Sequence, residues 1–190
     1  MANFEALLKR LSSRGIRPNT KTARDWFRKK IRDTRISKAS LLSDSDRKSS
    51  RPTIGKMYFF AYDPKYKEKL PYYDTFPLIF VVDYIPNGFL GINLHYVSPR
   101  NRIIIMDSLS SIASNDKYDS STKLRLTYGV LKRLGKFDMI KPCIKKYLYN
   151  HTKSHFVTID ANEWDIAIFL PVQKFVKASP SKVWSDSARK

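Results

Sequence analysis

The chain is poor in several features that mark common classes of protein. It contains one cysteine, Cys143, among 190 residues, so no disulfide can form within the chain. A single thiol fits a reducing compartment. No run of 18 or more apolar residues occurs, and apolar stretches such as residues 78–82 have only the length of a strand. We therefore expect no membrane-spanning helix, and the first residues lack the layout of a signal peptide.

Glycine and histidine are also scarce. The six glycines are scattered, and neither GxxxxGK(S/T) nor GxGxxG occurs, which argues against a nucleotide-driven motor. His151 and His155 stand four positions apart and could share a metal ion on a helix. No glutamate of an HExxH motif lies between them, so we interpret both as ordinary polar side chains. We predict no metal and no other cofactor.

Acidic residues are few relative to basic ones. The chain has 36 Lys and Arg against 17 Asp and Glu, a net charge of +19. Such an excess concentrates polyanions around the protein and predicts salt-sensitive binding to phosphate backbones. Residues 1–53 alone hold 15 basic and 5 acidic residues, a net charge of +10. Ribosomal, chromatin and virion proteins are the classes that this composition favours, ahead of enzymes.

The first quarter of the chain has the pattern of basic helices followed by a linker. Apolar residues recur with helical spacing over residues 4–11, and Gly15 is expected to end that helix. A second, strongly basic helix is predicted over residues 19–33. The Ser-rich residues 37–53 are interpreted as a linker, so that residues 1–53 form a basic arm. The phosphate contacts expected from the second helix are Arg24, Arg28, Lys29, Lys30 and Arg32.

Residues 54–190 are predicted to form one compact α+β domain with a basic C-terminal tail. We expect a small antiparallel β-sheet or partly open barrel packed with three or so helices. The pair Asn87-Gly88 predicts a hairpin between two strands. Arg100 and Arg102, at the start of an expected helix, are added to the predicted DNA contacts. Further strands are expected at residues 57–62 and 155–161. Helices are expected at residues 99–114, from residue 120 onward and at residues 141–150, and the basic tail is expected from Lys174.

Residues 62–78 are the most unusual segment, because they are rich in proline, tyrosine and lysine and show neither helix nor strand period. Long irregular segments inside a compact domain are often functional. Two interpretations stay open: the segment meets phosphates and stacks on exposed bases, or it packs rigidly on the sheet with solvated lysines. In the first interpretation the contacts are Lys65, Lys67, Lys69, Tyr66, Tyr72 and Tyr73.

The same segment carries a rival hypothesis. Metal-dependent nucleases need two or three converging carboxylates, often with a lysine nearby. Residues 63–65 form an acid-x-Lys triplet after a strand, and Asp74, Asp83 and Asp107 are further acids. An Asp-Pro pair after a strand is also a common turn signal, and we favour that interpretation.

Several motifs resemble those of one phage protein family. Residues 55–102 contain the pattern MYxFxYDPKxKxxLPYYDxFPL, followed by GFLGxNLHYxxP, and residues 106–109 read MDSL. The later stretches KPCIKKYL, IDANEWDIAIFLP and KVWSD fit the same family. Together these motifs resemble the DNA end protector, or head-completion, proteins of T-even-type contractile-tailed phages. The resemblance covers residues 54–186 and leaves the basic N-terminal segment unmatched.

The resemblance implies a virion protein at the head–tail region that binds double-stranded DNA ends and shields them from host exonuclease. It implies other virion proteins as partners, no membrane, no small-molecule substrate and no enzymatic turnover. The expected locations are the head and neck of the virion, and the host cytoplasm during assembly and after DNA entry. Two alternatives remain: a structural adaptor of neck, tail or baseplate, and the metal-dependent nuclease.

Overall fold

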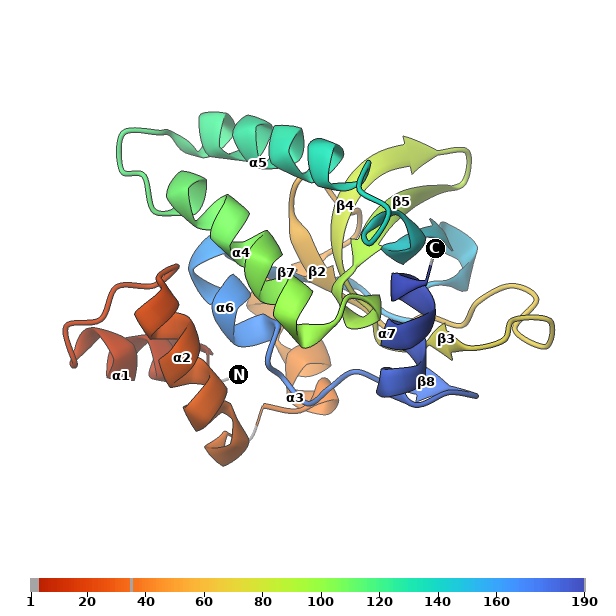
Figure 1. The fold of residues 1–190 in the computed structure, drawn as a ribbon, viewed down its shortest axis with the longest axis horizontal. Coiled ribbons are helices and arrows are strands. Elements are labelled where there is room, and N and C mark those ends of the chain that lie inside the picture. Colours follow the sequence, from red (N-terminus) through yellow and green to blue (C-terminus); the bar gives the residue numbers. More distant parts are fainter. Residues whose placement is uncertain (1–3, 35, 190) are drawn as a thin grey trace.

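The computed structural model describes residues 4–34 and 36–189 and confirms the α+β class. Six strands form one antiparallel sheet in the order β1-β7-β2-β4-β5-β6, which does not close into a barrel (Figure 1). A separate small pair joins β3 to β8. The strands are β1 Lys48–Ser49, β2 Met57–Phe59, β3 Tyr73–Asp74, β4 Leu78–Ile85, β5 Gly88–Asn93, β6 Ile144–Leu148, β7 Phe156–Ile159 and β8 Phe175–Val176.

The hairpin of β4 and β5 forms where the sequence predicts it. Asn87 adopts a positive φ of 60°, which asparagine tolerates better than most residues. Gly88 follows, and a Cβ at that position would stand 2.0 Å from the carbonyl oxygen of Tyr147. The turn therefore needs glycine because β6 approaches β5 closely there.

The aromatic run of β2 is explained by burial on both faces of the sheet. Met57 and Phe59 belong to the main core beneath the helices, whereas Tyr58 and Phe60 belong to a second, aromatic cluster on the opposite face. The Phe60 ring lies 5.0–6.0 Å, centroid to centroid, from four other aromatic rings. A strand buried on both faces has no polar alternation, which is why its sequence is continuously apolar.

Helices cover one face of the sheet. The long helices α4 and α5 pack against each other, and their N-caps are Ser98 and Asp119 (Figure 1). The helices are α1 Phe4–Ser12, α2 Lys21–Lys30, α3 Lys38–Ser43, α4 Pro99–Ala113, α5 Ser120–Leu134, α6 Trp164–Ala167 and α7 Pro180–Ala188. Short 3₁₀ helices occur at Ile31–Asp33, Ser45–Arg47, Leu94–Tyr96, Lys141–Cys143, Tyr149–His151 and Ala161–Glu163.

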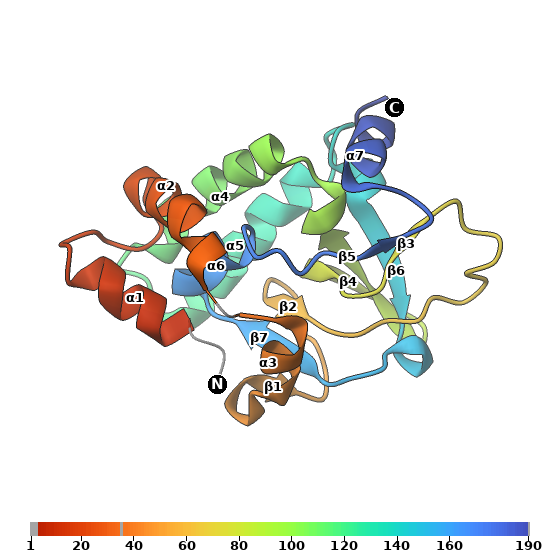
Figure 2. The same cartoon turned by 90° about the horizontal axis from the view of Figure 1, so that it is seen from below.

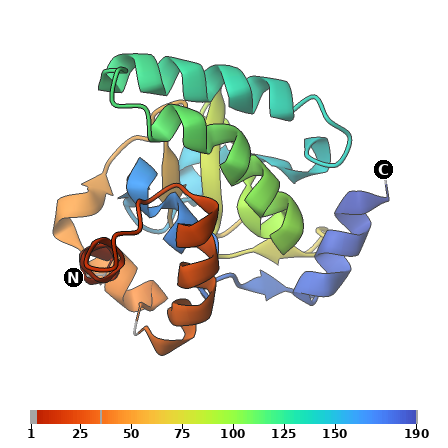
Figure 3. The same ribbon diagram turned by 60° about the vertical axis from the view of Figure 1, so that its left-hand side comes forward.

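Both predicted N-terminal helices are confirmed. Gly15, with a φ of 68°, follows α1, and the Thr20 side chain caps α2 by accepting a hydrogen bond from the Ala23 amide. Buried side chains of these helices, among them Phe4 and Phe27, belong to the same hydrophobic cluster as the sheet. Figure 3 shows the molecule with this side turned forward, where α2 packs against the rest of the protein.

Residues 37–53 correct one interpretation, because they contain regular structure instead of a linker. Ser37 and Ser40 form a reciprocal capping box at the start of α3, and Leu41 on that helix is fully buried. The strand β1 then pairs with β7. Ser37 and Ser40, which contribute to the Ser-rich composition typical of a linker, form the N-terminal cap of a helix.

The helix expected over residues 141–150 is wrong, and the basic tail expected from Lys174 contains regular structure. After a short 3₁₀ turn, β6 pairs with β5, burying Tyr147 while Lys146 stays exposed. The chain after Lys174 forms β8 and α7, and Val183 of α7 is fully buried. In both segments lysines interrupt a short apolar pattern.

A buried arginine ties the N-terminal segment to the body. The Arg24 side chain is 4% exposed; it contacts Asp107 of α4 and lies 3.3 Å from the Asp165 carboxylate of α6. Burial raises the pKa of Asp165 to about 6, although the Arg24 guanidinium lies beside it. Above that pH the pair is ionic, and the buried Asp165 carboxylate depends on Arg24 for compensation.

We expect Arg24→Met to lower the free energy of unfolding by about 3–5 kcal/mol at about pH 8, because Asp165 is then buried without its cation. The matched control is Arg28→Met on the exposed face of the same helix, with a change below about 0.5 kcal/mol. Urea unfolding curves with equal slopes give both values. Equal effects of the two substitutions would contradict a structural role for Arg24.

Candidate nucleic-acid interface

The structure separates the two groups of predicted DNA contacts. The basic helix α2 and the loop of residues 62–73, which projects from the body between β2 and β3, lie towards opposite ends of the molecule (Figures 1 and 2). Arg100 lies exposed in the first turn of α4, apart from both groups. The site is therefore built as two surfaces.

The first surface, here called the α2 face, is a solvent-facing basic stripe. Arg28, Lys29 and Arg32 line a shallow depression together with Asp25. Lys30 is also exposed and forms a loose ion pair with Asp33, at 3.9 Å. Opposite this stripe, the apolar side of α2 packs on the core. The α2 face can attract phosphates, but such contacts do not distinguish one region of a DNA duplex from another.

Two predicted contacts, Arg24 and Arg102, are buried and have to be removed from the set. Arg24 is held in the ion pair described above. The Arg102 guanidinium donates to the carbonyl oxygens of Val97, Ile168 and His95, at 2.9–3.2 Å. Phosphates cannot reach either group in this structure. For Arg24 a signal existed: it stands three and seven positions before the buried Phe27 and Ile31, on the same helical face.

The second surface is centred on Tyr66 in the 62–73 loop. Its side chain is 64% exposed, and its backbone has a φ of 59°, which bulky residues rarely adopt. Lys65 and Lys69 place their ammonium groups 4.9 Å and 5.8 Å from the centroid of the Tyr66 ring. Lys67 instead pairs with Asp63 at 3.0 Å, and its ammonium holds the pKa of that carboxyl below its usual range. The loop thus presents an aromatic ring flanked by two cations.

Lys177 fixes the shape of this loop. Its ammonium donates to the carbonyl oxygens of Lys67, Glu68 and Leu70, at 2.9, 3.1 and 3.2 Å, which uses all three of its donors. Lys177 also has a positive φ, of 70°. Among the described residues, positive φ outside glycine and asparagine occurs only at Tyr66 and Lys177. The strained backbone is therefore found in this loop and at the residue that anchors it. Nothing in the sequence marks Lys177 as the loop's anchor.

Beside the loop lies a cavity of about 410 Å³, here called the tyrosine pocket. Tyr72 and Tyr73, predicted as surface contacts, are half-buried and line it. The Tyr72 and Tyr96 rings lie 6.0 Å apart, and the Lys145 ammonium stands 4.1 Å from the centroid of the Tyr96 ring. Sequence reasoning missed Tyr96 and Lys145, the latter because β6 was taken for a helix. The side chains that define the pocket are Tyr62, Tyr72, Tyr73, Tyr96, Tyr147 and Lys146.

A buried polar network forms the floor of the tyrosine pocket. The Asp74 carboxylate accepts hydrogen bonds from the Phe76 amide at 2.9 Å and from the Asn93 side chain at 3.1 Å, and its Oδ2 lies 2.7 Å from His95 Nδ1. Asn93 also donates to the Tyr147 hydroxyl at 3.0 Å. Burial lowers the pKa of His95, which keeps its ring neutral at neutral pH.

A sequence model of one protein family, described as phage T4 terminal DNA protecting protein, matches residues 2–187. The chain belongs to this family. The match includes the basic N-terminal segment that the motif resemblance left uncovered. No curated protein and no solved structure matches the chain. No helix among the described residues has the length and apolarity that crossing a membrane requires.

In this family member the acids of the nuclease hypothesis have different partners and surroundings. Asp63 pairs with Lys67, Asp74 is in the pocket floor, Asp107 contacts Arg24, and Asp83 is exposed. Within residues 4–34 and 36–189, no three His, Cys, Asp or Glu side chains gather in a way that could hold a metal ion. The described geometry does not assemble the carboxylates that the hypothesis needs.

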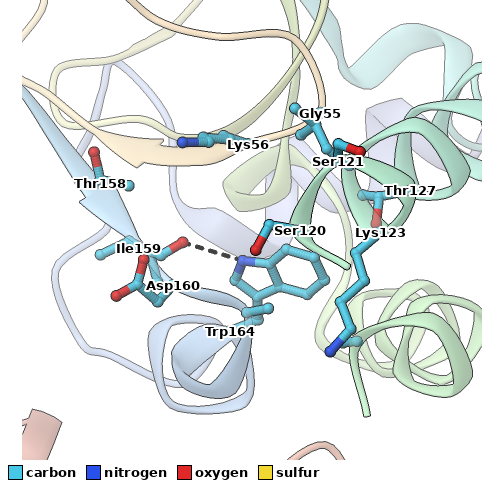
Figure 4. A pocket seen from close by; sticks show the side chains of 13 residues that line it. Gly55, Lys56, Ser120, Ser121, Lys123, Thr127, Thr158, Ile159, Asp160 and Trp164 are labelled. Carbon is cyan, nitrogen blue, oxygen red and sulfur yellow. Dashed lines mark hydrogen bonds between the residues drawn. The ribbon is translucent and has the colours of Figure 1, made fainter. Parts of the chain in front are cut away.

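A second cavity, of about 460 Å³, lies between the first half of α5, the residues just before β2 and the end of β7 (Figure 4). Its walls are mainly apolar, and the Trp164 indole in it donates to the Ile159 carbonyl at 3.2 Å. Lys56 and Lys123 line it, and so does the acidic Asp160. Mixed charge and apolar walls make it a poorer phosphate site than the loop end of the molecule.

We expect Lys177→Met to loosen the 62–73 loop, because three carbonyl oxygens lose their shared donor. A lysine-specific protease should then cut after Lys65, Lys67 or Lys69 roughly tenfold faster than in the parent protein. The control is Lys174→Met, which removes an exposed lysine nearby in the chain. Unchanged cleavage of Lys177→Met would show that the loop keeps its shape by other contacts.

Proposed function

We propose that this protein binds the ends of double-stranded DNA without sequence preference and shields them from host exonuclease. Membership of a terminal DNA protecting family and the net charge of +19 support the proposal. The observation that carries it is the exposed Tyr66 ring between Lys65 and Lys69 on an anchored, projecting loop. Shielding requires occupancy only, so we assign no reaction, cofactor or small-molecule substrate.

A duplex end differs from the rest of the duplex in one surface that this loop can bind. The terminal base pair exposes a flat aromatic face, whereas all other pairs are covered by their neighbours. The Lys65 and Lys69 ammonium groups lie over the Tyr66 ring in the free protein. When they move from the ring to the phosphates, Tyr66 can stack on such a face, and stacking on an aromatic side chain does not depend on the base. Lys65 and Lys69 can approach the last phosphates on either side.

The α2 face has a different part in the proposal. Arg28, Lys29 and Arg32 present fixed positive charge at the opposite end of the molecule, where they attract any phosphate backbone. Such contacts raise affinity and association rate for all DNA and do not select ends. We place the protein at the head–tail region of the virion, next to other virion proteins, and in the host cytoplasm during assembly and after DNA entry.

The test is competition binding at about physiological salt, with a labelled linear duplex against unlabelled linear and closed-circular DNA of one sequence. Linear DNA should compete far better, and the same ends should resist an added exonuclease. Tyr66→Ala should weaken end binding by about 1–3 kcal/mol, the value of one stacked base, and leave binding to circles unchanged.

Tyr118→Ala is the matched control, because Tyr118 is a partly exposed tyrosine between α4 and α5, away from the loop. It should behave like the parent protein in both assays. Equal competition by circles, with no protection, would reject end binding and favour a structural adaptor of the neck, tail or baseplate. DNA cleavage that stops with EDTA would favour the nuclease.

A second expectation concerns salt. Replacing Arg28, Lys29 and Arg32 together by glutamine should reduce the slope of log K against log salt concentration by about 3, close to one per lost phosphate contact. The preference for linear over circular DNA should remain. A loss of end preference in this triple variant would mean that the α2 face, and not the loop, selects the terminus.

A further inference from the structure

We propose that the tyrosine pocket holds the base of an unpaired nucleotide at the DNA terminus. The protein would then prefer an end with a short single-stranded extension to a fully paired blunt end. This inference rests on the proposed function, since it specifies which kind of end the site accepts. It adds a second binding position to the Tyr66 loop.

The dimensions and walls of the pocket fit one base. Its volume of about 410 Å³ lies within the range of small-ligand sites, and five of its twelve lining residues are tyrosines. Tyr72 and Tyr96 stand 6.0 Å apart at one side, with Tyr72 half-buried and Tyr96 buried. Proteins that bind unpaired nucleotides use such aromatic walls to receive a base that has left its stack.

The charges of the pocket indicate how a nucleotide would be oriented. The floor is Asp74, whose carboxylate would repel a phosphate. The cations lie with the outer strand β6: Lys146 is exposed, and Lys145 stands over the Tyr96 ring. A nucleotide would therefore enter with its neutral base toward Asp74 and its phosphate toward Lys145 and Lys146.

The polar floor also suits the edge of a base. Asp74 and the Tyr147 hydroxyl, both nearly buried, already accept hydrogen bonds from Asn93. Oxygen atoms have more than one acceptor site, so both can also receive the amino or imino hydrogens of a base.

The tyrosine pocket and the Tyr66 loop share residues. Pro64, Leu70 and Pro71, which flank the loop tip, line the pocket, and Tyr66 lies between them in sequence. Lys177 anchors the carbonyl oxygen of Leu70, so the same contact sets the pocket wall and the position of Tyr66. A terminal pair on Tyr66 and an unpaired neighbour in the pocket would use both surfaces of one rigid segment.

The experiment compares DNA hairpins that have one open end, either blunt or extended by one nucleotide at the 3′ or the 5′ strand. The parent protein should bind at least one extended hairpin about fivefold or more tightly than the blunt one, as expected for one additional stacked base. Equal affinity for all three ends would overturn the inference.

Tyr72→Ala should abolish the preference for the extension and keep the affinity for the blunt hairpin. Tyr72→Phe keeps the ring and should keep the preference. If Tyr72→Ala fails to fold, Lys146→Gln offers a surface substitution, which should reduce the preference without affecting the blunt end.

A second readout is 2-aminopurine in the extending nucleotide. Its fluorescence should be quenched on binding to the parent protein and to Tyr72→Phe, and not on binding to Tyr72→Ala; equal signals in all three would place the base elsewhere. Failure of the proposed function is distinguishable, because linear and circular DNA would then compete equally whatever the end.

Discussion

A chain with a net charge of +19 must give every buried cation a partner and leave the remaining cations in solvent. Three arginines meet this constraint in different ways. Arg24 lies against two carboxylates, Arg47 forms a two-pronged pair with Glu163 at 2.5 and 2.7 Å, and Arg102 donates mainly to carbonyl oxygens. Each joins segments far apart in the sequence. The positive charge of the protein thus also holds its N-terminal segment on the body.

The same rule explains the loop that carries Tyr66. The Lys177 ammonium donates hydrogen bonds to three carbonyl oxygens of the loop. Without Lys177 these oxygens would accept hydrogen bonds from water, and the loop would be mobile. The loop is then ordered before any ligand arrives, so binding does not have to supply that ordering free energy. The strained backbone at Tyr66 is compatible with this, because neighbouring contacts can hold a residue in a conformation that it would not adopt alone.

Local chemistry explains which parts of the fold could be predicted. The Asn87-Gly88 turn and the Thr20 cap depend on residues within a few positions of each other, and both were predictable. The strand β6 was taken for a helix because short apolar patterns interrupted by lysines fit either period. Its identity depends on pairing with β5, more than 50 positions earlier.

The candidate site shows the same limit. Tyr66 and its lysines stand out in sequence by composition, and the structure leaves that ring exposed between two of them. Tyr72 stands out equally and lies in a pocket wall. What separates the two residues is the anchor at Lys177, more than 100 positions later, and no local pattern encodes that contact.

Selection of a DNA end is a stricter requirement than binding to DNA. A phosphate near the terminus has nearly the same charge as one in the middle, so the α2 face cannot distinguish them. A discriminating contact must use something that only an end offers, and those features are an uncovered base-pair face and a strand free to leave the duplex. An exposed aromatic ring can stack on the uncovered base-pair face. An aromatic cavity can hold a base of the strand that leaves the duplex. The segment of residues 62–74 carries the ring and contributes part of the cavity wall, at the end of the molecule opposite the α2 face.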